Sequence, residues 1–521
     1  MMSCISAAFG RSMKRLIHLL PSVVVAHFSL VCQASAQTDP GPESDGTQQR
    51  LVAIGAAGMM QTVAYQWLTE LSDDIGARVT GSPAAKKAVA WGVEKMKSIG
   101  LTNIHTEQWT LPTGWTRGRS TAEMIAPLRR PLYVSAMGWT GSTPGDVEAD
   151  VMPANLLKLD ELTQDAARFR GKIVVMTVDG ALPTNPGPLI ARYCEFAKAA
   201  QESGAVALIG GQGGAKEQGM HLTHTGSTLC ANDFKMPVLS IAAEDQGQIE
   251  RLVARGQAVR LRLNVQNTFT SGPVPSENVV GEIQGNVEPE QILVVGAHLD
   301  SWDLATGSTD DGTGVCTVLA AASAIQKSGV RPRRTLRFVL FTGEEQGTLG
   351  SKAYTRLHAG ELQNHVAAML IDSGQGPIVD VDLGRTDVVA RFAPFANALR
   401  GFRELKFKDR ASFGTDSGPF VLVGLPGITF QQDSPEYRYT IHSAADTLDT
   451  VKPDVLAQNA SIMAITAFWL ADRPERFAAP WPPEKTARML RDQGAYERLK
   501  SSGQWPFGEL GADSPATPNP K

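Results

Sequence analysis

Cysteine is scarce in this chain, with five residues among 521. Three of them, Cys194, Cys230 and Cys316, follow the first 36 residues, and so few cysteines exclude a small fold held together by disulfide bonds. Cys194 and Cys230 could pair within one segment, and the sequence leaves that pairing open. Cys316 lies in an apolar helical stretch, where a buried core thiol is the simplest interpretation.

Basic charge is not in excess, since 49 Lys and Arg stand against 53 Asp and Glu. The formal net charge of −4 argues against a nucleic-acid partner, because phosphate contacts require a basic surplus. Aromatic residues at 7% and hydrophobic residues at 42% are ordinary for a globular protein and exclude disorder throughout the chain. A length of 521 residues suits roughly three domains.

Several common catalytic motifs are missing. The sequence contains no His-Glu-x-x-His, no paired Cys-x-x-Cys, no Gly-x-Ser-x-Gly and no phosphate-binding Gly-Lys-Ser/Thr. The enzyme chemistries that depend on these motifs therefore have little support here. Residues 210–214 are glycine-rich but lack the dinucleotide-binding spacing, so we expect a turn there.

The N-terminus has the pattern of a secretory signal peptide. Arg11, Lys14 and Arg15 precede an apolar stretch over residues 16–32, and Ala-Ser-Ala at 34–36 offers a cleavage site. A transmembrane anchor is the alternative, but two histidines and a proline interrupt the run, which is shorter than the roughly 20 apolar residues a spanning helix needs. We therefore expect residues 1–36 to be removed, leaving a secreted or periplasmic protein without a membrane anchor.

The remaining chain divides into segments of different composition. We expect a main domain in two parts, an inserted domain between them and a partly disordered C-terminal tail, at residues 37–144 and 266–490, 145–265 and 491–521. Runs typical of strands and a helix mark the inserted domain, at residues 171–177, 190–203, 205–210 and 236–241. Pro273 and Pro275 predict a linker back into the main domain.

Three short apolar runs in the main domain each end in a carboxylate or an imidazole. The runs and their ends are 292–295 with His298, 336–341 with Glu344 and Glu345, and 367–371 with Asp372. Continuous apolar runs of this length are typical of strands buried on both faces. Because ligands bind beyond the carboxyl ends of strands in an open α/β sheet, we expect these side chains to converge.

Further potential metal ligands lie close to these strands in the sequence. Asp310 and Asp311 precede an amphipathic helical stretch, and His442 supplies a second imidazole. Histidines and carboxylates without cysteine are the ligands of zinc or a similar divalent ion. Five ligand groups exceed what one catalytic zinc uses, and two metals about 3.5–4 Å apart, bridged by a carboxylate, would accommodate them. Asp300 is placed to orient the imidazole of His298.

Together these motifs resemble those of the co-catalytic zinc exopeptidases, and most of all the carboxypeptidase Q group. The matching segments are His298-Leu-Asp300-Ser-Trp-Asp303, Thr309-Asp310-Asp311-Gly312, Gly343-Glu344-Glu345, Asp372, Gly414-Thr-Asp416-Ser-Gly-Pro-Phe420 and His442-Ser-x-x-Asp446-Thr447. Residues 145–265 resemble the protease-associated domain that many members of this family insert. The resemblance implies an α/β fold with a mixed β-sheet flanked by helices, a peptide substrate and two zinc ions per chain; homodimer formation is a further family expectation.

The resemblance also implies a role for each site residue. Asp310 would bridge the two zinc ions. His298 and Asp372 would complete one site. Glu345 and His442 would complete the other. Glu344 would be the general base that takes a proton from the attacking water; the residues alone do not show which of the two glutamates is base and which is ligand.

Two questions stay open at this stage. Relatives often place a hydrogen-bonding side chain just before the last histidine to hold the oxyanion, whereas this chain has Ile441, so Tyr437 or Tyr439 would have to substitute.

The substrate is either a dipeptide or short peptide, or a longer peptide cut by an aminopeptidase. An inactive binding protein and a glutaminyl-cyclase-like transferase are rival interpretations, and the complete ligand set argues against both. His221 and His224 are expected to be loop histidines.

Overall fold

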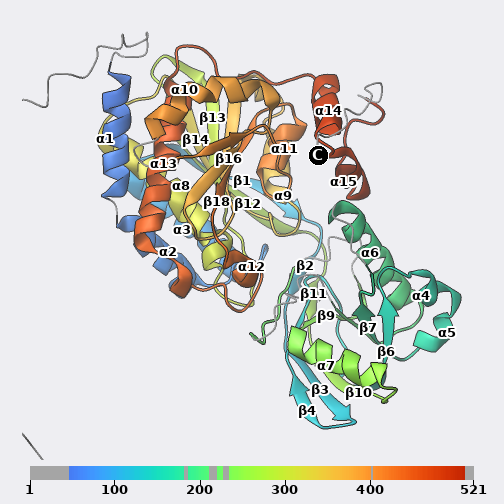
Figure 1. Cartoon of the computed structure of the whole chain (residues 1–521). Helices are drawn as coiled ribbons and strands as arrows, with labels where there is room; N and C mark the ends of the chain where they lie inside the picture. Colours follow the sequence, from blue (N-terminus) through green and yellow to red (C-terminus); the bar gives the residue numbers. More distant parts are fainter. Residues whose placement is uncertain are drawn as a thin grey trace, which may run out of the picture. The chain divides into compact units, whose positions relative to one another are not determined.

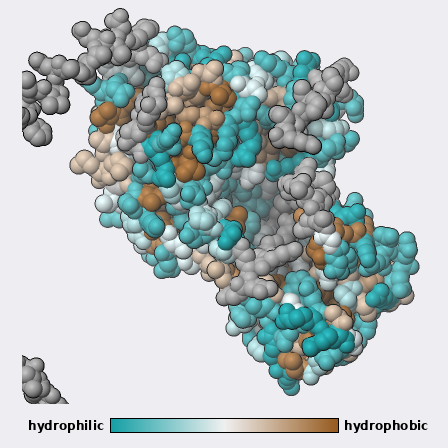
Figure 2. Space-filling model, in the orientation of Figure 1, coloured by the Kyte–Doolittle hydropathy of each residue, from teal (hydrophilic) through white to brown (hydrophobic). Residues whose placement is uncertain are grey.

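The computed structural model describes residues 46–60, 62–180, 186–210, 220–226, 234–399 and 403–510. The expected signal peptide, Cys230 and the end of the expected tail lie outside the described residues. On the face drawn in Figure 2, hydrophilic residues predominate and hydrophobic ones form small separate patches.

The first of two large sheets has eight strands, and its centre is parallel (Figure 1). In spatial order the strands are β1 (Thr102–Leu111), β12 (Val274–Ile283), β14 (Arg334–Phe341), β13 (Glu288–His298), β15 (His365–Ile371), β18 (Gly427–Gln432), β16 (Ile378–Asp382) and β17 (Lys406–Lys408). Strands β14, β13, β15 and β18 run parallel. At one edge β1, β12 and β14 pair antiparallel in succession, and at the other β16 pairs antiparallel with β18 and parallel with β17. The expected mixed α/β sheet is confirmed.

Helices cover both faces of this sheet (Figure 1). Those that share a hydrophobic core with one face are α1 (Thr47–Met59), α2 (Val63–Thr69), α3 (Pro83–Ile99), α8 (Thr313–Ser328), α10 (Val389–Leu399) and α13 (Pro453–Asp472). The opposite face packs against α9 (Leu349–Leu357) and α11 (Ser417–Leu422) through Tyr354 and Phe420. Because both faces are covered, the central strands contain the continuous apolar runs that the sequence predicts, such as residues 292–295 of β13 and 367–371 of β15.

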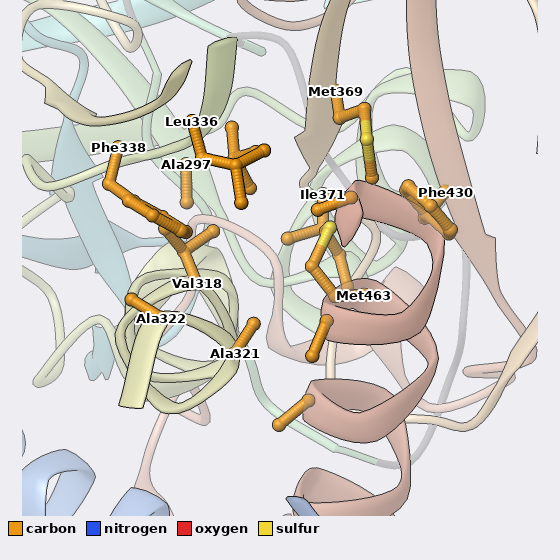
Figure 3. Close-up of a cluster of buried hydrophobic side chains, with 14 of the residues drawn as sticks. Ala297, Val318, Ala321, Ala322, Leu336, Phe338, Met369, Ile371, Phe430 and Met463 are labelled. Atoms are coloured by element: carbon orange, nitrogen blue, oxygen red, sulfur yellow. The ribbon is translucent and has the colours of Figure 1, made fainter. Parts of the chain in front are cut away.

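Helices α8 and α13 form the centre of the larger core. Figure 3 shows Val318 of α8 near Leu336 and Phe338 of the sheet, and Met463 of α13 near Ile371. Burying a large apolar side chain of this kind stabilises the fold by about 1.5–3 kcal/mol. Among the described residues, α13 is long and apolar enough to cross a membrane, but 83% of its most apolar window is buried in the protein, as in a core helix.

The second sheet also has eight strands. In spatial order they are β4 (Arg130–Leu132), β3 (Ser120–Ala126), β10 (Arg260–Val265), β6 (Val147–Asn155), β7 (Ile173–Thr177), β8 (Ala207–Ile209), β9 (Val238–Ile241) and β5 (Val134–Ala136). Helices α4 (Asp160–Gln164), α5 (Ala166–Phe169) and α6 (Pro186–Glu202) share a core with one face, and α7 (Ala243–Ala254) packs on the other. Strands β3, β4 and β5 precede residue 145, so this sheet starts earlier than the expected inserted domain.

The two crossings of the chain between the sheets pair with each other. Strand β2 (Gly114–Thr116) leads from the first sheet to the second, and β11 (Thr268–Thr270) leads back. They form a two-stranded antiparallel ribbon in which Gly114 lies opposite Thr270. The connection is therefore built from main-chain hydrogen bonds.

Two expectations about the organisation of the chain differ from the structure. The linker expected at Pro273 and Pro275 is the start of β12, where Pro275 lies opposite Thr110 of β1. Pairing of β12 with β14 begins only at Val279, so Pro275 occupies a part of the strand with a single neighbour, where its missing N–H is tolerated. The segment expected to be a tail contains α15 (Tyr496–Ser501), which follows α14 (Pro483–Asp492) and packs against α6.

Candidate metal centre

Three side chains of the expected cluster lie at one edge of the first sheet. His298 is the last residue of β13, Glu345 follows β14 and Asp372 follows β15. These strands are adjacent and parallel, and His298 is in register with Phe341 at the end of β14. The common direction of the strands brings their carboxyl ends together, as the apolar runs predict.

Asp310 lies between the two histidines of the cluster. It lies in the segment Ser308–Gly312, directly before α8, where its own backbone angles (φ −129°, ψ 90°) are not helical. His442 follows α12 (Tyr437–Thr440). The Oδ1 atom of Asp310 is 3.2 Å from Nε2 of His298, and its Oδ2 atom is 3.2 Å from Nε2 of His442. One carboxylate thus faces two imidazoles with different oxygens.

Each imidazole has a second carboxylate beside it. The Nε2 atom of His298 is 3.7 Å from Oδ1 of Asp372, and Nε2 of His442 is 3.0 Å from Oε2 of Glu345. We call these two sets, which share Asp310, the His298 half and the His442 half. All five expected ligand residues are therefore together in the structure.

The donor atoms are arranged more like ligands of a cation than like partners in hydrogen bonds with one another. Oδ2 of Asp310 and Oε1 of Glu345 are buried and accept no hydrogen bond from the part of the chain that the structure describes, although buried carboxylate oxygens nearly always have a partner. Two ligands each about 2.0–2.1 Å from one tetrahedral zinc would be about 3.3 Å apart, close to the separations of Asp310 from both histidines. The chemistry of the donors, imidazole and carboxylate, is that of zinc.

Asp311 is a second acidic neighbour of His298. His298, Asp311 and Asp372 also offer donor atoms within 4.8 Å of one another. Both oxygens of Asp311 are already used, however: Oδ2 accepts the N–H of His298 at 3.3 Å and Oδ1 accepts the N–H of Gly314 at 3.0 Å. These bonds fix the start of α8 against β13 and favour a structural role.

Buried carboxylates give the cluster an excess of negative charge, and this shifts the pKa values of its members. Burial raises the pKa of Glu345 to about 7 and raises that of Glu344 well above its usual range. Burial also opposes ionisation of Asp310, but its contacts with His298 and His442 outweigh this and lower its pKa. Against their own burial, neighbouring carboxylates raise the pKa of both histidines well above the usual value. Bound cations would compensate the negative charge of these carboxylates, as the protons on the histidines do in their absence.

The two adjacent glutamates differ in their surroundings. Glu345 is 6% exposed and contacts His442. Glu344 is partly exposed, and its carboxylate makes no hydrogen bond to the described residues. Glu345 therefore lies inside the donor set and Glu344 beside it, a difference that sequence spacing does not reveal.

Asp300 contacts the cluster differently from the expected way. The Nδ1 atom of His298 is 3.0 Å from the main-chain oxygen of Asp300 and 3.7 Å from its carboxylate. That carboxylate instead accepts the N–H groups of Glu344 and Glu345 at 3.2 and 3.4 Å and the hydroxyl of Thr80 at 2.8 Å. Asp300 therefore orients the histidine through its backbone and the two glutamates through its side chain.

The neighbourhood of Ile441 contains one hydroxyl group directed at the cluster. The hydroxyl of Tyr437 is 3.5 Å from Oδ1 of Asp372. The hydroxyl of Tyr439 instead accepts a hydrogen bond from Arg438, whose guanidinium group also lies over the Tyr439 ring. Of the two tyrosines left open by the sequence, Tyr437 is the one beside the expected ligands.

Sequence reasoning missed Arg78. Its side chain is fully buried and donates hydrogen bonds to the main-chain oxygens of Leu299, Thr306 and Gly307. These residues belong to the loop that joins His298 to Asp310, so Arg78 fixes the loop. No motif marks it, because its partners are more than 200 residues away in the sequence.

Among the described residues, the other histidines and cysteines singled out from the sequence lie outside the donor set. His221 packs on the ring of Tyr133, and His224 is 3% exposed in a bridge with Ser443, beside His442. Cys194 is disulfide-bonded, while Cys230 lies outside the described residues. Cys316 is a free, fully buried thiol, as expected.

The chain is similar to known peptidases over most of its length. The profile of Peptidase family M28 matches residues 278–467. Carboxypeptidase Q from Mus musculus is 30% identical over 428 residues, which cover 82% of this chain and 89% of the relative. An aminopeptidase from Bacillus subtilis is 25% identical over 417 residues, or 78% of this chain and 84% of the relative.

Solved structures of peptidases are also similar to this chain. The crystal structure of a peptidase M28 precursor from Shewanella amazonensis has a TM-score of 0.73 and 30% sequence identity, with 84% of this chain and 99% of that chain covered. A zinc aminopeptidase from Bacillus subtilis shares the fold at a TM-score of 0.62 and 22% identity, over 80% and 97% of the two chains. The resemblance to the zinc exopeptidases is thus confirmed, and the chain belongs to peptidase family M28.

Proposed function

We propose that this protein is a di-zinc exopeptidase that hydrolyses dipeptides or short peptides. The observation that carries the proposal is the position of Asp310, whose two oxygens each face a different imidazole. A shared carboxylate of this kind suits two ions bound side by side. His298 and Asp372 would hold one zinc ion, and Glu345 and His442 the other.

The residues around the cluster have separate roles in the proposed reaction. Zinc bound there would polarise the scissile carbonyl and lower the pKa of the attacking water towards about 7. Glu344 takes a proton from that water and later donates it to the leaving amine. Asp300 keeps Glu344 and Glu345 in place through their backbone N–H groups.

The proposed oxyanion donor is Tyr437. Replacing Tyr437 with phenylalanine is expected to lower kcat by about 10²-fold, because an aligned donor is lost in the transition state. KM should change little, since the substrate carbonyl develops its full negative charge only during the reaction. Steady-state kinetics of the zinc-loaded variant test this, with Tyr439→Phe as the matched control. Equal losses in both variants would reject Tyr437 as the donor.

The relatives and the second sheet support the proposed substrate class. The relatives are named carboxypeptidase Q and aminopeptidase, and both names describe removal of residues from chain ends. Segment 220–226, which lies within the expected protease-associated domain, contacts the loop of His442. We therefore assign to this domain the role of limiting access to the site. Secretion or periplasmic export and homodimer formation belong to the same proposal.

A set of three dipeptides distinguishes the proposed specificities. The zinc-loaded mature protein is incubated with one dipeptide that is free at both ends, N-acetylated or C-amidated, and release of the free amino acid is measured. Cleavage of only the free form is expected for a dipeptidase that reads both termini. Cleavage of the amide as well would indicate an aminopeptidase. No cleavage of any form, with two zinc ions bound, would contradict the proposed substrate class.

A further inference from the structure

His442 has an unusual backbone conformation for a residue of the cluster. Its φ angle is +56°, in the left-handed region that residues other than glycine rarely adopt. Such a conformation persists only where the surrounding structure determines it. The groups that contact the His442 loop therefore decide where its imidazole lies.

Part of that surrounding structure comes from the second sheet region. The N–H of Thr225 donates a hydrogen bond to the main-chain oxygen of His442 at 2.8 Å, and His224 forms an antiparallel bridge with Ser443. Gly226 lies against the imidazole itself, since a Cβ atom there would be 3.6 Å from Nδ1 of His442. The segment of residues 224–226 therefore contacts both the backbone and the imidazole of His442.

Arg117, directly after β2, connects this segment to the loop between His298 and Asp310. Its guanidinium group donates to Oδ1 of Asp303 at 2.8 Å and to the hydroxyl of Thr225 at 2.8 Å, and it also contacts the main-chain oxygen of Ala136. The ion pair with Asp303 is largely buried, with 11% and 19% of the two side chains exposed. Asp303 follows Trp302, whose ring meets that of His442 edge-on at 6.1 Å.

We propose that Arg117 is a positioning residue for the His442 half of the metal centre. It ties together the two segments that contact His442: the Thr225 segment, which holds the histidine's backbone, and the Trp302–Asp303 loop, which packs on its ring. The inference rests on the proposed function, because it concerns how one of the two zinc ions is held.

The His298 half has supports of its own that do not involve Arg117. His298 is the last residue of β13 and Asp372 directly follows β15, inside the parallel sheet, and the loop after His298 is held by Arg78. Loss of Arg117 should therefore loosen one zinc site and leave the other intact. Groups that orient a metal ligand typically change metal affinity by about 10–100-fold.

Zinc titration of the metal-free full-length mature protein against a competing chelator measures this directly. The wild type should bind two ions, and the variants Glu345→Gln and Asp372→Asn identify which binding phase belongs to which half. In Arg117→Ala the His442 phase should weaken by about 10–100-fold while the His298 phase stays unchanged. Arg117→Lys, which keeps one ionic contact, should recover part of the affinity.

A matched control separates positioning from a general effect of losing a charge. Arg262 lies on β10 of the second sheet and pairs with Glu123 and Glu148, so Arg262→Ala removes the same charge away from the centre and should leave both phases unchanged. Equal weakening of both phases in Arg117→Ala, no weakening, or the same selective loss in Arg262→Ala would overturn the inference. A wild type that binds fewer than two zinc ions would instead overturn the proposed function.

Discussion

Replacing Glu344 with glutamine is expected to reduce turnover by as much as about 10⁴-fold, the upper range for a general base, while the protein keeps its zinc. Glutamine has nearly the same shape but cannot take a proton from water. The carboxylate of Glu344 is outside the donor set around Asp310, so its replacement removes no proposed ligand. The measurement is kcat at saturating substrate together with the zinc content of the same sample.

A second glutamate provides the control for this variant. Glu288 lies at the start of β13, the strand that ends in His298, and pairs with Arg334. Glu288→Gln also replaces one glutamate with glutamine, at the opposite end of β13 from His298, and turnover should stay at the wild-type level. Retained turnover in Glu344→Gln would reject Glu344 as the base, whereas loss of zinc would show that it is a ligand.

With the proposed di-zinc centre, Asp310→Asn is expected to abolish measurable activity and to release both zinc ions. Asp310 is the one residue shared by the two halves. A neutral amide cannot supply the negative charge that this carboxylate gives to both proposed zinc sites. A variant of a ligand in a single half, such as Asp372→Asn, should instead lose affinity for one ion. Elemental analysis after dialysis against a weak chelator compares the zinc content of the two variants.

Asp311 is the matched control for Asp310, because it is the adjacent residue and has the same side chain. Its oxygens accept the N–H groups of His298 and Gly314, and asparagine can still accept one of these bonds. Asp311→Asn should therefore keep both zinc ions, with a change in stability of about 1 kcal/mol. Loss of zinc in this variant would assign Asp311 to the ligand set in place of Asp310.

The sequence predicts the ends of the strands better than the contacts around them. His298, Glu345 and Asp372 follow apolar runs in a parallel sheet, and the direction of parallel strands is enough to bring such residues together. The hydrogen-bond partners of Asp300 and the burial of Arg78 depend instead on contacts between residues 40 to more than 200 positions apart. No local pattern in the chain carries that information.

Turn-forming residues were a weaker guide to the organisation of the chain than periodicity. Pro273 and Pro275 suggested a linker, yet β12 starts there because that part of the strand has a neighbour on one side only. The short strands β3, β4 and β5 precede the expected boundary at residue 145. They escape detection because two of their pairing partners, β10 for β3 and β9 for β5, come from distant parts of the chain.

The ribbon of β2 and β11 means that the chain leaves the first sheet and returns to it at nearly the same point. Gly114 and Thr270 are cross-strand partners, and opposite residues in an antiparallel pair have Cα atoms only about 4.5–5.5 Å apart. A two-residue turn could therefore join the ribbon's strands directly and bypass everything between them. In evolutionary terms, the second sheet has the geometry of a cassette that can be gained, exchanged or lost without breaking the continuity of the first.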